Sequence, residues 1–595
     1  MKTSTNFARV AVTAGLTAVM TLGNVVAPAA MALADTGSTV TFTDVDYAAS
    51  TTYKGIQIFK AKVATTGGTQ TVSNIEWAND DAKKAVLDAI KTKDASFAGE
   101  NAQDAADWLS ANTGVAGTDS KVASDNVLSM IAANLKGSNL WSTTTKGNAS
   151  LSGLEAGYWL FLTDTAGTPG TPGGTSTDTF TSPVYVALDG VSATTVTPKK
   201  DVPTVEKKVL DDAEAAVVDP KTSDKWNDVA DSQIGQEINY RLTGTIASNY
   251  ATFDTYAYKF TDVLSGGLDY VEGSVKVYAL NDGAYEEINS KNYTVTNPDA
   301  RNNNTLTVEF KVGDDKKGLK DVAGVDANSK IVVFYKAKLN GNAVIGNADG
   351  NKGGNPNTVK LEYSNNPYAE GTGETIENTV ADFAFKLNLN KVDQGTERGL
   401  AGAVFTIQSD DTNTEGQYVA SKADAAKGIV AGQLVAVADA NNLPEYVKFT
   451  SGSDGKIAVS GLDAGSYKVT EVQTPDKSKY TKANPFTFTI KPKYDDKAMK
   501  VTGLTASVSE ADKGRTDIAF GTLDGTVGDH ELTGKDGTGT NAATGEVTIN
   551  VGNTKSVGLP ITGLNGVTLT WVAGGAVLVI GVAHLIRGRR EESEE

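Results

Sequence analysis

The chain of 595 residues carries a formal net charge of −18, which argues against a nucleic acid or an anionic membrane surface as its partner. It contains no cysteine and only two histidines, so the common zinc sites and the Ser-His and Cys-His nucleophile systems are essentially excluded. We therefore expect no metal, no cofactor and no conventional enzymatic activity, in a chain long enough for about three domains.

The first 34 residues have the pattern of a secretory signal peptide. Lys2 and Arg9 precede an apolar stretch over residues 10–27, and Ala32-Leu33-Ala34 supplies the small residues of a cleavage site. We therefore exclude residues 1–34 from the fold and expect the mature chain to lie outside the cell. That compartment permits disulfides, yet the chain has no cysteine, so any covalent reinforcement must use other chemistry.

Most of the mature region alternates Val, Ile, Thr, Tyr and Phe with polar residues, and Gly, Asn and Asp turns interrupt the alternation. Short strands at this spacing indicate β-sandwiches. Clear examples are residues 273–279, 292–296, 305–310 and 331–337.

One helical excursion lies between residues 80 and 135. Apolar residues recur there at helical spacing over 82–90, 102–109 and 127–135. Strand-like segments precede and follow it, so we expect an insertion in the first sandwich. The predicted fold is mainly β, with three tandem immunoglobulin-like β-sandwich domains, the first of which carries a helical insertion.

Composition sets the expected boundaries between the domains. Residues 195–205 contain Pro198 and Pro203 and indicate an extended connector. Residues 364–377 form a second polar stretch that contains glycine. We therefore place an N-terminal domain at 35–198, a middle domain at 199–375 and a C-terminal domain at 376–558.

In the middle domain, three polar residues fall within apolar, strand-like segments. Side chains of a strand alternate between its two faces, so residues two apart share a face. Lys207, Asp262 and Asn357 each share a face with apolar neighbours. We expect these three to meet, with Lys208 and Asn355 as the nearest competitors, because a one-residue error in register is easily made here.

The C-terminal domain repeats this arrangement with a glutamate. Lys391, Glu471 and Asn553 each continue an alternation of apolar residues, so each falls on a face that is expected to be buried. A charge buried there costs several kcal/mol unless it is paired or neutralised. The alternative is that three unrelated strand residues extend their polar ends to water.

An amide bond between the lysine amine and the asparagine side chain would neutralise such a set, with the loss of ammonia. Burial lowers the pKa of a lysine, which leaves a nucleophilic neutral amine. Burial also raises the pKa of a carboxyl group, which can then donate a hydrogen bond and shuttle protons. We therefore predict one intramolecular isopeptide bond in each of the two domains, with Asp262 or Glu471 as the assisting acid.

The first domain is expected to lack such a bond. Its Gly-Leu-Glu-Ala-Gly sequence at 153–157 is echoed by Gly-Leu-Asp-Ala-Gly at 461–465, which predicts that the first and third domains are related. Thr163 stands where the echo places Glu471 of the third domain, or Leu162 if the tyrosines are aligned. No asparagine follows before the connector, so the first domain has neither the acid nor the acceptor.

Residues 559–595 comprise a short motif, an apolar run and a basic tail. The run at 564–586 contains no Asp, Glu, Lys or Arg. As a helix it would measure about 34 Å, enough to cross a bilayer core of about 30 Å, and the arginines behind it would hold the tail in the cytoplasm. An ordinary single-span membrane protein is the alternative. The motif directly before the run is Leu559, Pro560, Ile561, Thr562 and Gly563.

This layout resembles the cell-wall sorting signal of Gram-positive surface proteins, LPxTG followed by a membrane span and a basic tail. The resemblance implies that a sortase cleaves between Thr562 and Gly563 and passes the acyl group to an amine. In the connector, Val-Thr-Pro-Lys-Lys at 196–200 resembles the pilin motif VYPKN, whose lysine supplies that amine. Lys199 is thus the implied polymerisation lysine, with Lys200 as the alternative.

Further segments resemble pilins. Residues 258–268, around Asp262, look like the YxFxDxLxxGL segment of pilin middle domains, and residues 467–480, around Glu471, resemble the E-box YxLxETxAPxGY. The repeated Gly-Leu-Asp-Ala-Gly hairpin looks like that of Cna B-type domains. Over essentially its whole length the chain therefore resembles a sortase-assembled pilus backbone subunit, or major pilin, of a Gram-positive bacterium.

The resemblance implies that a pilin-specific sortase joins Thr562 of one subunit to Lys199 of the next, and that a housekeeping sortase attaches the base to peptidoglycan. The implied partners are further copies of this chain, both sortases, accessory pilins, peptidoglycan and a possible host or matrix ligand. The protein would be a sortase substrate, held first in the membrane and then exposed in a surface pilus.

The sequence leaves two alternative functions open. A monomeric LPxTG-anchored adhesin that binds a host or matrix ligand would share the sorting signal and the sandwiches but would not need Lys199. A wall-bound glycosidase would need a pair of carboxylates converging in a deep cleft, and these strand patterns offer none.

Overall fold

The computed structural model describes residues 37–43, 51–66, 69–112, 123–145, 148–165, 180–196, 202–211, 219–347, 353–520, 531–533 and 540–555. The predicted signal peptide, Lys199, Lys200, the sorting motif and the apolar run lie outside these residues. None of the helices within the described part has the length and apolar character of a membrane span.

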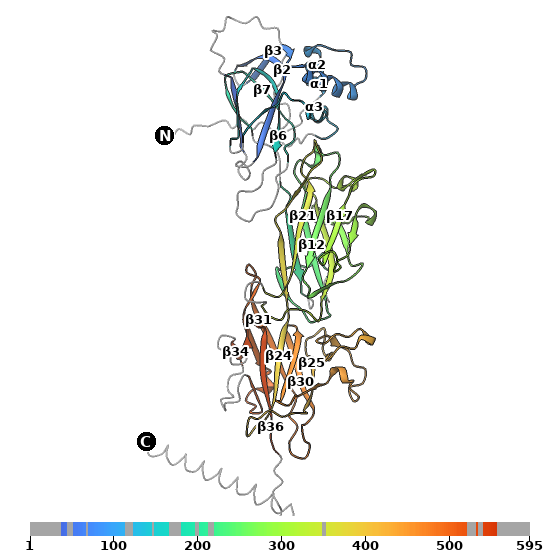
Figure 1. The fold of residues 1–595 in the computed structure, drawn as a ribbon, viewed down its shortest axis with the longest axis vertical. Helices are drawn as coiled ribbons and strands as arrows, with labels where there is room; N and C mark the ends of the chain where they lie inside the picture. The colour runs from blue at the N-terminus through green and yellow to red at the C-terminus, as the bar shows by residue number, and fades with distance from the viewer. Residues whose placement is uncertain are drawn as a thin grey trace, which may run out of the picture.

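Three domains follow one another along the long axis of the molecule, and each pairs two β-sheets around a core (Figure 1). The first domain lies at one end with its helices to one side, the middle domain is central, and the third domain is at the other end. The fold is therefore mainly β with tandem sandwich domains, as predicted from the alternation of apolar residues.

The first domain combines a small sheet, β5-β1-β8, with a larger one, β3-β2-β6-β7, to which β4 is added. The strands are β1 Ser38–Phe42, β2 Thr52–Thr66, β3 Thr69–Trp77, β4 Ser142–Thr143, β5 Ser150–Leu154, β6 Gly157–Thr165, β7 Val184–Leu188 and β8 Ala193–Val196.

Three helices between β3 and β4 confirm the predicted helical insertion: α1 Asp80–Lys93, α2 Ala102–Asn112 and α3 Val127–Leu135. The Asn79 side chain caps α1 by accepting a hydrogen bond from the Ala82 N–H, which satisfies one of the free amides of the first turn. The apolar stripe of α1 is buried and belongs to one core cluster with α2, α3 and strand residues. The helices thus cover one face of the larger sheet, while the small sheet packs on its other face around a separate cluster of buried residues.

The middle domain has two large sheets. One has the order β10-β23-β21-β12-β17-β16 with β22 on β21, and the other has the order β15-β14-β20-β11-β9 with β13 on β20. The first comprises β10 Val229–Asp231, β12 Tyr258–Leu264, β16 Thr294–Thr296, β17 Thr305–Phe310, β21 Asn355–Ser364, β22 Thr372–Glu374 and β23 Asn378–Phe383. The second comprises β9 Val205–Leu210, β11 Glu237–Thr245, β13 Leu268–Tyr270, β14 Lys276–Asn281, β15 Ala284–Glu287 and β20 Lys330–Leu339.

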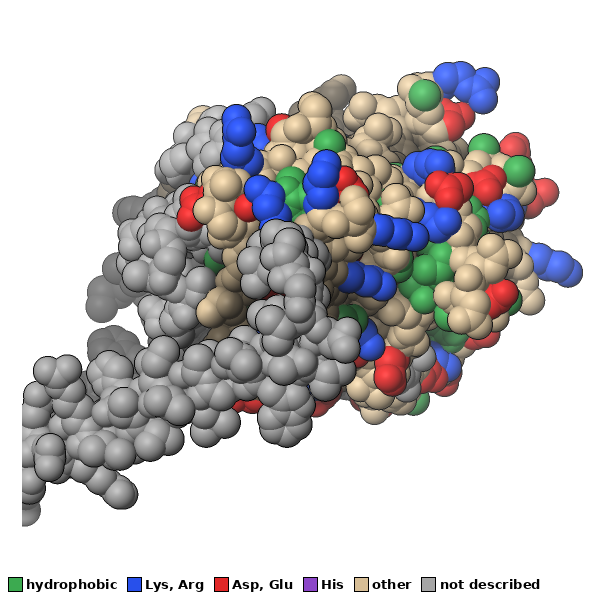
Figure 2. Space-filling view, turned by 90° about the horizontal axis from the view of Figure 1, so that it is seen from below, with side chains coloured by type: hydrophobic (Ala, Val, Ile, Leu, Met, Phe, Trp, Pro, Cys, Tyr) green, Lys and Arg blue, Asp and Glu red, His purple; other side chains and the backbone are tan. Residues whose placement is uncertain are grey.

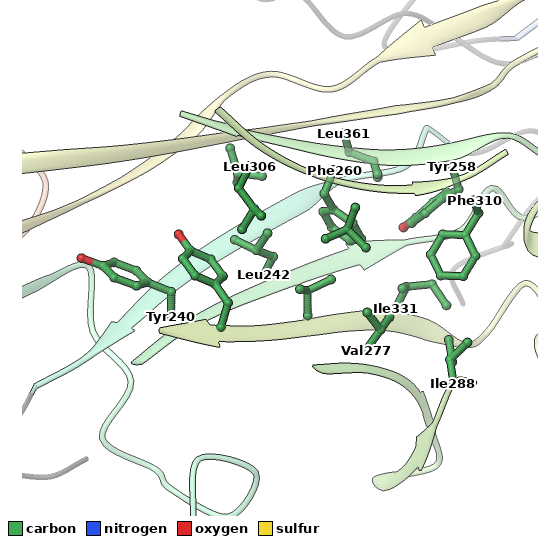
Figure 3. Packing of buried hydrophobic residues seen from close by; sticks show 14 of the residues in the cluster. Tyr240, Leu242, Tyr258, Phe260, Val277, Ile288, Leu306, Phe310, Ile331 and Leu361 are labelled. Atoms are coloured by element: carbon green, nitrogen blue, oxygen red, sulfur yellow. The ribbon is translucent and has the colours of Figure 1, made fainter. Parts of the chain in front are cut away.

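The core between these sheets is rich in aromatic side chains. Figure 3 shows Tyr240, Tyr258, Phe260 and Phe310 among aliphatic residues from both sheets. All four are fully buried. This packing gives any polar group placed between the sheets an apolar environment that is shielded from bulk solvent.

The third domain pairs the sheet β29-β24-β36-β33, with β35 on β36, and the sheet β27-β26-β25-β30-β31-β32-β34, with β28 on β25. The first contains β24 Phe385–Asp393, β29 Lys456–Leu462, β33 Ile518–Phe520, β35 Thr540–Asn541 and β36 Glu546–Asn553. The second contains β25 Val404–Ser409, β26 Tyr418–Val419, β27 Leu434–Val435, β28 Phe449–Thr450, β30 Gly465–Gln473, β31 Phe486–Asp495, β32 Lys500–Val508 and β34 Glu531–Thr533.

Short elements complete the described fold. A two-stranded hairpin is formed by β18 Val312–Gly313 and β19 Lys316–Lys317. The 3-10 helices are η1 Tyr250–Thr252, η2 Ser290–Asn292, η3 Leu319–Asp321, η4 Ala425–Lys427, η5 Glu445–Val447 and η6 Glu510–Asp512.

The last strand of the middle domain extends past the boundary expected at 375/376. Strand β23 pairs antiparallel with β21 and parallel with β10, both of the middle sheet. Only one residue, Ala384, separates β23 from β24, and β24 belongs to the third domain. We therefore propose Ala384 as the junction between the two domains.

A loop of the middle domain binds tightly to the third domain. The Asn347 side chain accepts a hydrogen bond from Val501 N and donates one to Val501 O, each at 2.9 Å. Gly346, at φ +60°, lies so close to Gly545 that a Cβ atom on it would be 2.4 Å from the Gly545 nitrogen. Only glycine fits this contact, so the junction is fixed by close backbone packing as well as by hydrogen bonds.

Charge is mixed on the end of the molecule formed by the third domain. Lys and Arg side chains and Asp and Glu side chains are both scattered over its visible described surface (Figure 2). The net charge of −18 is therefore not gathered into a single acidic patch on this face.

Candidate cross-linking sites

The predicted set in the middle domain comes together between its two sheets. Lys207 lies on β9 in one sheet, while Asp262 and Asn357 lie on the adjacent strands β12 and β21 of the other. All three residues are completely buried. The Lys207 Nζ atom lies 2.6 Å from Asp262 Oδ1 and 2.7 Å from Asp262 Oδ2. The amine, the acid and the amide are thus enclosed in one site that is shielded from bulk solvent.

A tyrosine connects the amine to the amide in this site. The Tyr335 hydroxyl accepts a hydrogen bond from Lys207 Nζ at 2.9 Å and another from Asn357 Nδ2 at 2.6 Å. Within the described residues, Asn357 Oδ1 has no hydrogen-bond partner. The carbonyl that would be attacked is therefore not tied up by another donor.

The two competitors in this domain have other roles. Lys208 points to the opposite face of β9, where its Nζ lies 2.7 Å from Asp228 Oδ1. Asn355 is buried, but its side chain bonds both the N–H and the C=O of Val344 and the carbonyl of Asp382. An amide with all these partners holds a loop and is not free to react. The geometry therefore favours Lys207 and Asn357 as the reacting pair.

Burial shifts both titratable partners in this site toward their neutral forms. Desolvation lowers the pKa of Lys207 from 10.5 to about 8, although the Asp262 charge opposes this shift. Desolvation raises the pKa of Asp262, against the effect of the lysine. One proton shared between the two groups can thus rest on the carboxyl and leave a free amine, which is the nucleophilic form.

The predicted set in the third domain also meets, with a different geometry. Lys391 on β24 and Asn553 on β36 lie on neighbouring parallel strands of one sheet, whereas Glu471 on β30 reaches them from the facing sheet. All three are buried. Lys391 Nζ donates directly to Asn553 Oδ1 and also to Val551 O, the latter at 3.2 Å. The nucleophile here already contacts the carbonyl that it would attack.

Glu471 contacts Asn553 Nδ2, the nitrogen that would leave as ammonia. Its Oε1 atom accepts a hydrogen bond from Asn553 Nδ2 at 3.0 Å and lies 3.8 Å from Lys391 Nζ. Its Oε2 atom accepts from the Ala483 N–H at 2.7 Å, which fixes the carboxyl group in place. Burial lowers the pKa of Lys391 to about 8. The carboxyl is placed to carry a proton from the attacking amine to the departing ammonia.

Sequence reasoning missed two contributors to these sites. Tyr335 shares the buried face of β20 with aliphatic residues, and a tyrosine in such an alternation was the available signal. The contact of the Ala483 N–H could not be predicted from the sequence, because every residue type except proline has this group and only the fold determines where it points.

The first domain lacks such a set among its described residues. Its buried polar side chains there include no lysine, aspartate or glutamate. Thr163 is buried at the place matching Glu471, and its hydroxyl accepts a hydrogen bond from Thr181 N at 2.9 Å. The two hairpins have similar backbone conformations at their glycines. Gly153 and Gly157 have φ values of +74° and +145°, and Gly461 and Gly465 have φ values of +85° and +138°.

A variant without the middle-domain bond should reveal the buried lysine through its pH dependence. In Asn357→Ala, Lys207 keeps an amine whose pKa is about 8 in the fold against an ordinary 10.5. The unfolded chain then binds more protons between these values, so the variant should gain stability as the pH rises from about 8 to about 10. We expect its unfolding midpoint to rise over this range relative to the bonded wild type, and parallel curves would contradict the assignment.

Residues 385–504 match the family model of the SpaA prealbumin-like fold domain. This part of the chain is therefore similar to that family of domains. No curated protein matches the chain.

Several solved structures are similar to much of the chain at low sequence identity. The T6 backbone pilin of serotype M6 Streptococcus pyogenes is 16% identical, with 87% of this chain and 98% of that chain covered, at a TM-score of 0.46. The full-length major pilin SpaD from Corynebacterium diphtheriae is 15% identical, with 88% and 98% covered, at a TM-score of 0.41. BcpA, the major pilin subunit of Bacillus cereus, is 17% identical, with 69% and 89% covered, at a TM-score of 0.35.

Proposed function

We propose that this chain is the backbone subunit of a covalently polymerised pilus on the surface of a Gram-positive bacterium. A pilin sortase cleaves after Thr562 and joins that residue to Lys199 of the next subunit, so that each copy of the chain is a partner of the next. A housekeeping sortase then links the base of the fibre to peptidoglycan. In this proposal the chain is a substrate of these enzymes and not an enzyme.

The observation that carries the proposal is the pair of buried lysine, acid and asparagine sets. Each set places an amine and an amide in a site that is shielded from bulk solvent, with an acid beside them. If these lysines did not react, their burial would only lower the stability of the fold. The chain carries a sorting motif but no cysteine, so it cannot form disulfides. The reaction would give it a covalent cross-link that reductants do not cleave.

The sets also suggest how each bond forms. The neutral amine attacks the side-chain carbonyl carbon of the asparagine, and a new C–N bond forms. The acid takes the surplus proton from the attacking nitrogen and supplies one to the amide nitrogen, which leaves as ammonia. The acid ends as it began, so the middle and the third domain each modify themselves once and need no cofactor.

Intact mass tests this proposal directly. We expect the mature wild-type chain to be lighter than its sequence by two ammonia molecules, one for each set. Lys207→Ala and Lys391→Ala should each restore one of them, beyond the mass change of the substitution itself. Lys208→Ala, at the neighbouring, partly buried position of β9, is the matched control and should still lack two. A wild-type mass equal to that of the sequence would refute both bonds.

A further inference from the structure

The two candidate sites differ in how the acid reaches the leaving nitrogen. In the third domain, Glu471 accepts a hydrogen bond directly from Asn553 Nδ2 at 3.0 Å. In the middle domain, both oxygens of Asp262 are directed at Lys207 Nζ. The group that touches Asn357 Nδ2 there is the Tyr335 hydroxyl, at 2.6 Å. The middle domain therefore has a hydroxyl at the place where the third domain has a carboxylate.

The Tyr335 hydroxyl is in direct contact with the reacting groups. It accepts hydrogen bonds from Lys207 Nζ and Asn357 Nδ2, and both oxygens of Asp262 contact the same Nζ atom. A phenol has one hydrogen to donate and two lone pairs to accept with, so the two donors occupy both lone pairs and its own hydrogen remains to be donated. The ring of Tyr240 stacks on it with centroids 5.2 Å apart, and Tyr335 itself is 1% exposed. The hydroxyl is thus held in one position, out of reach of bulk water.

We infer that Tyr335 is a fourth member of the middle-domain site, in which its hydroxyl relays a proton from Asp262 to the departing nitrogen of Asn357. This inference rests on the proposed cross-link between Lys207 and Asn357. The third domain needs no such residue, because its acid contacts the leaving nitrogen itself.

The protons balance without any further reactant. The neutral Lys207 amine attacks Cγ of Asn357, and the Nζ–Cγ bond forms. Protonated Asp262 gives its proton to the Tyr335 oxygen, while Tyr335 gives its own hydroxyl proton to Nδ2. The Cγ–Nδ2 bond breaks with its electron pair on nitrogen, and ammonia leaves. The surplus proton on Nζ passes to the Asp262 carboxylate, so acid and phenol both regain their starting forms.

Tyr335→Phe tests the relay, because it removes only the hydroxyl and keeps the ring. The rate of bond formation is followed after synthesis of the whole mature chain, by the mass of the proteolytic peptides that span each bond. We expect the bond between Lys207 and Asn357 to form about tenfold or more slowly in this variant. The bond in the third domain, within the same molecules, should form at the wild-type rate.

Tyr258→Phe is the matched control. Tyr258 is buried in the same core, and its hydroxyl donates to Thr245 O at 2.9 Å, so this variant also loses one buried hydrogen bond. Its middle-domain bond should form at the wild-type rate. Equal rates in Tyr335→Phe and Tyr258→Phe would overturn the relay while leaving the cross-link intact. Absence of the bond from the wild type would overturn the relay and the proposed cross-link together.

A second measurement covers the case in which Tyr335→Phe does not fold. Fluorinated tyrosine incorporated throughout the chain keeps every ring and hydroxyl but makes each phenol more acidic. A relay through Tyr335 predicts that the rate changes in the middle domain and stays constant in the third domain, whose lysine and asparagine bond to Val551 O and Glu471. An unchanged rate in the middle domain would overturn the relay.

Discussion

Asn357→Ala is expected to lower the free energy of unfolding of the middle domain by about 4–5 kcal/mol, because a cross-link that closes a loop of about 150 residues restricts the unfolded chain by that amount. The variant also leaves Lys207 and Asp262 buried as an unreacted pair, which adds a desolvation cost. Denaturant unfolding, followed together with intact mass, measures the effect. The mass should show one ammonia lost instead of two.

Thr358→Ala provides the control for this experiment. Thr358 follows Asn357 on β21, and its hydroxyl bonds the Thr379 hydroxyl at 2.9 Å on the partly exposed face. Its loss should cost only about 1 kcal/mol. If Asn357→Ala proves no less stable than Thr358→Ala, the cross-link does not stabilise this domain.

Lys199→Ala is expected to abolish covalent polymerisation altogether. Wild-type cells should show a ladder of high-mass species that survives boiling in detergent, since amide bonds between subunits do not dissociate. Without the acceptor amine, only monomers attached to the wall or the membrane should remain. Immunoblots of cell-wall extracts from bacteria that contain their own sortases measure this result.

The neighbouring lysine serves as the matched control. Lys200→Ala should leave the ladder unchanged if Lys199 is the acceptor, and the opposite pair of results would assign Lys200. A ladder that persists in the double variant would contradict polymerisation through this connector. It would favour a chain that is anchored to the wall one copy at a time.

Strand periodicity was sufficient to predict which side chains are buried. Lys391, Glu471 and Asn553 continue apolar alternations in the sequence, and all three are buried in the fold. The period of two follows from backbone geometry alone, so it holds without knowledge of neighbouring strands. The same reasoning predicted the helical insertion, because a period near 3.6 is equally local.

Periodicity could not choose between Asn355 and Asn357. These residues are two apart, share a face of β21 and are both buried. What separates them is the loop at Val344, which occupies the amide of Asn355. That contact depends on how the chain turns after β20, and a strand pattern carries no information about it.

Periodicity also could not predict which sheets the reacting residues occupy. The middle-domain pair lies across the two sheets, whereas Lys391 and Asn553 lie on neighbouring strands of one sheet. Both arrangements give the same alternation along each strand. The difference comes from pairings between segments that are far apart in the chain, which only the assembled sheets reveal.

The position of Asn357 on β21, before the last strand of its domain, has a mechanical consequence. In the proposed fibre, a pull would enter at Lys199 and cross the first bond from Lys207 to Asn357. It would then follow the backbone to Lys391 and cross the second bond to Asn553. The segment between Asn357 and Lys391, which contains β22 and β23, would be the main stretch of folded chain under tension.

This force path does not pass through the first domain. All of its described strands precede the connector lysine, so no tension would pass through them. In the proposed fibre this domain would bear no load and would not need a covalent cross-link, which agrees with the threonine at the place of the acid. Under high force, such a fibre would lengthen by peeling β23 away from β21 in each subunit, and that pair of strands would set its elastic limit.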